Sequence, residues 1–84
     1  MFLYFQWKSG HWGYIARENF PVLVNWILKG EVIAVDADSL GREKKILLET
    51  MIKHHSLKLR AEKVRIGTRI LEILRIEKKS FDES

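Results

Sequence analysis

The sequence of 84 residues lacks cysteine altogether and has few amide side chains. Without cysteine the protein has no disulfide bonds, no thiolate metal ligands and no thiol nucleophile. Its amide side chains are Gln6, Asn19 and Asn25, whereas lysine, glutamate and isoleucine are abundant. This usage is typical of proteins from thermophiles.

Long hydrophobic runs are also absent. The longest apolar segment, residues 20–28, is interrupted by Asn25 and is far shorter than the roughly 20 residues that cross a membrane. Residues 1–5 are apolar but lack the basic start of a signal peptide. We therefore expect a cytoplasmic protein with no membrane partner.

The composition is that of one small domain. Apolar residues make up 46% of the chain, although a chain of 84 residues is near the size at which a core becomes hard to complete. Chains of this size often complete their core by self-association. We expect a single domain over residues 1–84, with residues 79–84 frayed, that forms a homodimer or another homo-oligomer.

Aromatic and basic residues occupy different halves of the chain. Eight of the nine aromatic residues lie within the first 26 positions, and twelve of the fifteen Lys and Arg residues lie between Arg42 and Lys79. Five acids lie in that second segment, which leaves a local net charge of +7. A positive excess of this kind attracts nucleic acid.

The chain begins with a predicted hairpin. Residues 2–8 and 12–17 are β-prone, and Ser9-Gly10 between them is a turn signal. Residues 2–8 are almost wholly apolar, which predicts a strand that is covered on both faces.

A helix and a third strand are expected next. Asn19 can cap a helix that has Pro21 in its first turn, and Gly30 ends that helix. Residues 31–35 are rich in β-branched side chains and predict a strand. With the strand at 12–17 they would form a βαβ unit.

The second half predicts two helices. One reaches from about residue 40 to residue 54 and is capped by Asp38 or Ser39. The other begins at Ala61 or Thr68 and ends near Lys78, because apolar residues recur there at helical spacing: Ile66, Ile70, Ile73 and Leu74. Residues 56–66 also fit a strand. The expected fold class is therefore α/β, with a small sheet of three to four strands that contains a βαβ unit, followed by two basic amphipathic helices.

Three carboxylates follow the strands of the expected βαβ unit. Glu18 comes after the strand at 12–17, and Asp36 and Asp38 come after the strand at 31–35. If these strands are neighbours, their carboxyl ends meet at the edge where open α/β sheets bind ligands. Carboxylate oxygens suit Mg²⁺, and Mg²⁺ suits phosphoryl transfer. The alternative is a protein that needs no cofactor.

The segment from Val32 to Gly41 resembles the Asp-x-Asp-x-x-Gly motif of Toprim domains, which occur in primases, topoisomerases and small nucleases. In that family two aspartates and a glutamate on an earlier strand hold catalytic Mg²⁺. The resemblance implies that Glu18, Asp36 and Asp38 form a minimal Mg²⁺ site for phosphoryl transfer of the nuclease or primase type.

A second resemblance extends further along the chain. The chain is similar to the small tRNA-binding regulatory subunit of the KEOPS tRNA-modification complex. The similarity rests on Asp36, Asp38, Arg42-Glu43, the helix that follows, Glu62 and Gly67-Thr68-Arg69. That family has no catalytic metal. The resemblance implies a regulatory protein with an RNA partner and a protein complex around it.

Helix capping explains the same acidic residues without a metal. Asp38 and Ser39 are favoured helix N-caps, and Glu18 precedes the positively polarised start of a helix. We favour this interpretation, in which the protein has no catalytic residues and works by binding.

Part of the basic segment is balanced by its own acids, because Glu49 is spaced four residues from both Lys45 and Lys53. The other bases that we expect to contact phosphates are Lys58, Arg60, Lys63, Lys78 and Lys79. Contacts of this kind give affinity for RNA or DNA without sequence selectivity.

Three aromatic residues are candidates for binding. If exposed, Trp7, Trp12 and Tyr14 can stack on unpaired bases or dock a protein, and otherwise they belong to the core or to a dimer interface. The histidines show no spacing that is typical of zinc sites.

The sequence therefore predicts a small non-catalytic nucleic-acid-associated protein that binds or regulates. A Toprim-like Mg²⁺ enzyme is one alternative, and a regulatory subunit that docks a protein without contacting nucleic acid is the other. The choice between RNA, DNA and protein as the partner stays open.

Overall fold

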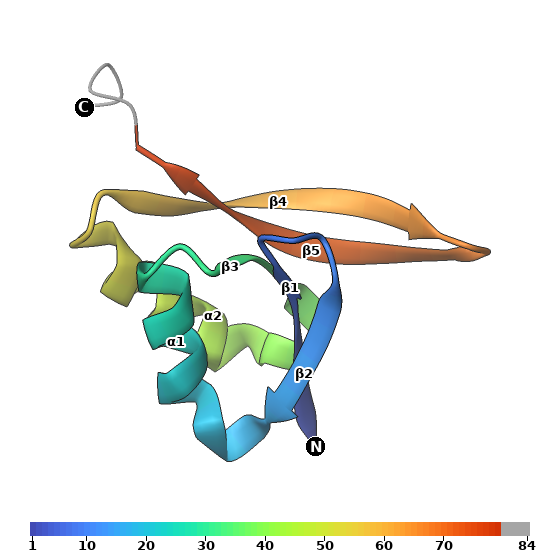
Figure 1. The fold of residues 1–84 in the computed structure, drawn as a ribbon, viewed down its shortest axis with the longest axis horizontal. Coiled ribbons are helices and arrows are strands. Elements are labelled where there is room, and N and C mark those ends of the chain that lie inside the picture. Colours follow the sequence, from blue (N-terminus) through green and yellow to red (C-terminus); the bar gives the residue numbers. More distant parts are fainter. Residues whose placement is uncertain (80–84) are drawn as a thin grey trace.

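The computed structural model describes residues 1–79 and consists of one sheet with a layer of helices on one face (Figure 1). Residues 80–84, where we expected fraying, lie outside the described part. The elements follow in the order β1 (Phe2–Trp7), β2 (Trp12–Ala16), a 3₁₀ turn (Arg17–Asn19), α1 (Phe20–Leu28), β3 (Val32–Asp36), α2 (Ala37–Lys53), β4 (Leu57–Ile66) and β5 (Arg69–Lys78).

The sheet has five strands in the order β2-β1-β3-β5-β4, and every neighbouring pair is antiparallel. The prediction of three to four strands is therefore wrong. The strands β2 and β3 run in the same direction with α1 between them along the chain, but β1 lies between them in the sheet. They are not the neighbouring parallel strands that the expected βαβ unit required.

The predicted second basic helix is also wrong, because residues 57–78 form a long hairpin. Strands β4 and β5 pair from Leu57 with Lys78 to Ile66 with Arg69, which leaves Gly67-Thr68 as a two-residue loop. Gly67 has a φ of +63°, the left-handed conformation that such loops require and that glycine adopts without strain. The adjacent residues Ile73 and Leu74, which suggested one face of a helix, point to opposite faces of the sheet.

Both helices pack on the same face of the sheet (Figure 1). Leu3 and Phe5 of β1, together with Leu74 of β5, belong to a buried cluster with residues of α1 and α2. Phe2 and Tyr4 alternate with these residues and point to the other face. The prediction that this strand is covered on both faces is wrong, since neither α1 nor α2 covers the face that carries Phe2 and Tyr4.

The hairpin extends beyond the rest of the sheet (Figure 1). Strand β5 pairs with β3 through Arg75, Leu74 and Ile73 only, opposite Ala34–Asp36. The two strands pair with each other over ten residue pairs. The half of the hairpin near Gly67 is therefore a two-stranded ribbon that no third described strand flanks.

Three aromatic rings fill the end of the core beside β2. The ring centroids of Phe5 and Trp7 lie 4.9 Å apart, and Trp26 of α1 lies 4.9 Å from Trp7. Gly13 of β2 lies opposite Phe5 and leaves room for these rings. A Cβ atom at Gly13 would lie 2.7 Å from Nε1 of Trp7 and 3.2 Å from the ring of Phe5.

We predict that Gly13→Ala lowers the free energy of unfolding by about 1–3 kcal/mol, because the added methyl group overpacks this cluster. Chemical denaturation measures the loss, and tryptophan fluorescence should change with it. Gly10→Ala is the matched control: a Cβ there meets nothing within 4 Å, so its backbone strain should leave the tryptophan spectrum unaltered. An equal spectral change in both variants would contradict the packing role of Gly13.

Candidate nucleic-acid interface

The face of the sheet opposite the helices carries a patch of exposed aromatic side chains, which we call the aromatic face: Phe2 and Tyr4 of β1, and Trp12 and Tyr14 of β2. Tyr14 is 67% exposed, Phe2 and Tyr4 are each 47% exposed, and Trp12 is 39% exposed. Large apolar side chains are usually buried in a domain core, so a contiguous exposed group of them is a candidate binding surface.

Tyr14 lies at the centre of this patch. It is directly opposite Tyr4 in the β1–β2 ladder, with ring centroids 6.2 Å apart. Phe2 meets the Tyr14 ring edge-on at 5.2 Å. Trp12 lies opposite Gln6 on the same face. The rings are held by the ladder of two neighbouring strands, so their positions do not depend on a loop.

The sequence identified this surface in part. Trp12 and Tyr14 are exposed as a binding role requires, whereas Trp7 is half-buried and packs against Phe5 and Trp26 at the edge of the core. Phe2 and Tyr4 were missed. Aromatic residues occupy both faces of β1, so the period of two that distinguishes a covered face from an open one is hidden in this strand.

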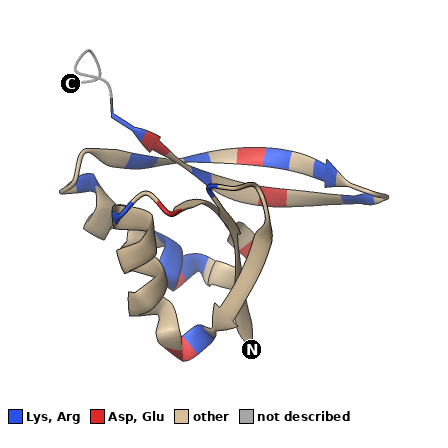
Figure 2. Cartoon of the chain, in the orientation of Figure 1, with Lys and Arg blue, Asp and Glu red and all other residues tan. Residues whose placement is uncertain are grey.

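The hairpin of β4 and β5 carries much of the positive charge (Figure 2). Between Leu57 and Lys78 there are seven basic residues and three acidic ones. Part of this charge is neutralised in an ion-pair network on the open face of the sheet. Arg60 lies 3.3 Å from both Glu62 and Glu77, and Nε of Arg75 donates a hydrogen bond of 2.7 Å to Glu62.

The five predicted phosphate contacts all belong to the hairpin or follow it, but they do not share one surface. Lys58 and Arg60 point to one face of β4, and Lys63 points to the other. Lys78 shares the face of Lys63, because it is paired with Leu57, which also points to that face. Arg60 has two carboxylate partners, whereas no carboxylate of residues 1–79 lies within ion-pairing distance of Lys63.

Two further bases lie at the tip of the hairpin and were not singled out from the sequence. Arg65 and Arg69 flank the Gly67-Thr68 loop at the tip of the hairpin. Both are exposed, and neither makes an ion pair with a described residue. The assignment of this segment to a helix concealed them, since a helix has no projecting tip at that position.

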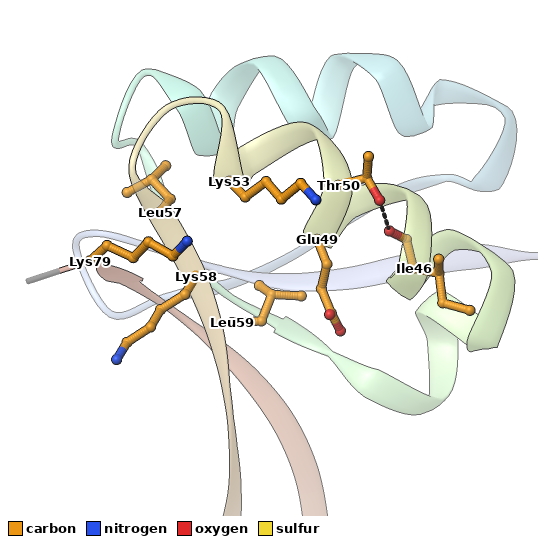
Figure 3. Close-up of a pocket in the computed structure, with 8 residues that line it drawn as sticks. All are labelled: Ile46, Glu49, Thr50, Lys53, Leu57, Lys58, Leu59 and Lys79. Atoms are coloured by element: carbon orange, nitrogen blue, oxygen red, sulfur yellow. Dashed lines mark hydrogen bonds between the residues drawn. The ribbon is translucent and has the colours of Figure 1, made fainter. Parts of the chain in front are cut away.

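A pocket of about 290 Å³ lies between α2 and β4 (Figure 3). It is lined by Lys53 and Glu49 of α2, by Leu57, Lys58 and Leu59 of β4, and by Lys79. Figure 3 shows Lys53 extended across the pocket and the carboxylate of Glu49 beside Leu59. Lys58 and Lys79 are the two predicted phosphate contacts that line this pocket.

The segment from Asp36 to Gly41 is held by contacts within the protein. The backbone N–H of Tyr4 donates to Oγ of Ser39 at 3.1 Å, and Ser39 donates to the carbonyl of Asp36 at 3.1 Å. Arg17 donates to the carbonyl of Ser39 at 2.7 Å. Gly41 has a φ of +80° and kinks α2, so the start of that helix is a separate turn.

The structure does not bring Glu18, Asp36 and Asp38 together in one group of possible metal ligands. Among residues 1–79 no group of three or more His, Asp or Glu side chains could hold a metal ion. The antiparallel sheet explains this result, since β1 separates the ends of the two strands after which these acids lie. Ser39 was predicted to cap the helix but links β1 to β3 instead, and Asp36 precedes the helix without a capping bond from its side chain.

Comparisons of the chain with protein-family models, with curated proteins and with solved structures find no match. The resemblances to Toprim domains and to the KEOPS subunit therefore stay predictions. In the part of the chain that the structure describes, no helix has the length and apolar character to cross a membrane.

The ion-pair network predicts a measurable titration. The hydrogen bond from Arg75, with the nearby charges of Arg75 and Arg60, lowers the pKa of Glu62 below its usual range. Because the pKa of Glu62 is depressed in the folded state, the ion pairs stabilise the folded protein at pH values above the usual pKa of glutamate. This stabilisation is lost as the pH falls through the folded-state pKa of Glu62. We predict that Arg75→Met raises the pKa of Glu62, as measured by NMR titration of its side-chain carboxyl carbon.

Arg69→Met is the matched control, because Arg69 lies on the same strand and has no ion-pair partner among residues 1–79. It should leave the pKa of Glu62 where it is. An Arg75→Met variant with an unaltered Glu62 titration would show that the network does not form in solution.

Proposed function

We propose that the protein binds single-stranded nucleic acid, RNA or DNA, by stacking unpaired bases on the aromatic face. The observation that carries this proposal is the exposure of Phe2, Tyr4, Trp12 and Tyr14 on a sheet face that neither helix covers. Each base that stacks on an aromatic side chain contributes about 1–3 kcal/mol, and stacking tolerates any base because each one has a π face.

The charge of the hairpin supports the same function. Its excess of four positive charges would attract phosphates, and the release of counterions would make binding sensitive to salt. Lys58 and Arg69 point to the same open face of the sheet as the aromatic rings. A strand could thus place its bases over β1 and β2 while its phosphates lie near the hairpin.

The aromatic face favours single strands over duplexes. In a duplex the bases are already stacked on each other, so only their edges are exposed and aromatic side chains cannot stack on their faces. In a single strand the base faces are free, so the rings of β1 and β2 can replace the missing neighbours.

Fluorescence anisotropy with labelled single strands of mixed sequence tests the proposal. We predict salt-sensitive binding that is tighter for single-stranded than for duplex probes of the same length. Tyr14→Ala should weaken the affinity by about tenfold or more, as the loss of one stacked ring implies. Val22→Ala, which removes an exposed apolar side chain from α1, is the matched control and should bind as the unaltered protein does.

Two results would contradict the proposal. One is the absence of salt-sensitive binding by the folded protein, which would leave the aromatic face for a protein partner. The other is equal affinity of the Tyr14→Ala and Val22→Ala variants, which would place nucleic acid on another surface.

A further inference from the structure

Strand β4 lies at the edge of the sheet, and no strand of residues 1–79 pairs with its outer side. We infer that a second copy of this chain pairs with this edge. The two β4 strands would run antiparallel about a two-fold axis at Ala61 and join the two sheets. An interface of this kind is self-complementary, as the commonest dimer symmetry requires. It does not depend on the proposed function.

The hydrogen bonding of the hairpin shows which residues are available for this pairing. The backbone N–H of Lys79 donates to the carbonyl of Ser56 at 2.8 Å, so these two residues are a hydrogen-bonded pair of the ladder. Such pairs alternate along antiparallel strands. The odd-numbered residues of β4 therefore turn their N–H and C=O groups to the outer edge, and Ala61 is the central one.

Charge on the open face selects the register. An axis at Ala61 places Arg60 directly opposite Glu62 of the second copy, and Glu62 opposite Arg60 of the second copy. An axis at Arg60 or at Glu62 would instead bring two identical charges together, which is destabilising for residues directly opposite in a sheet. The register about Ala61 has no like-charged pair along β4.

The helix-facing side of β4 is complementary in the same register. Lys63 of the second copy would lie opposite Leu59, which is half-buried at the pocket next to α2. Its aliphatic stem would cover Leu59, and its ammonium group would reach toward the carboxylate of Glu49, which lies beside Leu59 (Figure 3). Neither Glu49 nor Lys63 has an ion-pair partner among residues 1–79.

The inferred interface also gives the projecting ribbon a neighbour. An isolated two-stranded hairpin is at best marginally stable in water. About the Ala61 axis, the outer half of β4 in each copy would pair with the inner half of β4 in the other. The aromatic face lies at β2, the opposite edge of the sheet, so it stays accessible in the dimer.

Sedimentation equilibrium of the full chain tests this inference. We predict a dimer of the 9.9 kDa chain, and Ala61→Pro should convert it to a folded monomer. The proline removes an N–H that points to the edge and no bond of the hairpin, so the circular dichroism spectrum should be retained. A monomer for the unaltered protein at millimolar concentration would overturn the inference, as would a folded Ala61→Pro variant that dimerises equally well.

A charge exchange tests the register independently. Glu49→Lys and Lys63→Glu should each weaken dimerisation by about fivefold or more, and the double variant should restore it, because the pair is re-formed with reversed charges. Failure of the double variant to recover, with its thermal stability intact, would contradict the register. A dimer that is lost in Tyr14→Ala and retained in Ala61→Pro would place the second copy on the aromatic face and refute both proposals.

Discussion

The short pairing between β3 and β5 is the contact on which the rest of the structure depends. It joins the N-terminal hairpin and its helices to the C-terminal hairpin through three residue pairs, Ala34 to Asp36 with Ile73 to Arg75. Leu74 at its centre is buried in the core, and Ile73 beside it is buried on the opposite face. Because this junction is short and the hairpin is long, the outer half of the hairpin extends past the sheet with its cations exposed.

The second constraint is the number of helices. Two helices cover one face of the five-stranded sheet, so only the side chains of the strands themselves lie on its other face. At the β4–β5 side these are ion pairs, in which Glu62 is shared by Arg60 and Arg75. At the β1–β2 side they are aromatic rings. The open face thus divides into a charged part and an aromatic part, and the aromatic part is where binding would yield the most free energy.

The helices and strands up to the end of α2 could be predicted from the sequence, whereas the C-terminal hairpin could not. Turn residues at Ser9-Gly10 and Gly30 and the first-turn Pro21 indicated the limits of the first hairpin and of α1. In the C-terminal half, the isoleucines fit helical spacing, and the Gly67-Thr68 loop between β-branched segments was the hairpin signal that this spacing concealed. Glu18 was expected to lie beside Asp36 and Asp38, but the strand order places β1 between the two strands that these acids follow. Trp12 and Tyr14 were predicted as binding residues, whereas Phe2 and Tyr4 depend on which face the helices cover, a tertiary property.

Binding of nucleic acid to the open face can be tested by mapping a single-stranded oligonucleotide on the protein through amide chemical-shift changes. If the open face binds nucleic acid, the largest changes will lie in β1 and β2 around Tyr4 and Tyr14, with smaller changes in the hairpin near Arg69. Changes confined to α1 and α2, on the covered side of the sheet, would show that nucleic acid does not bind the open face.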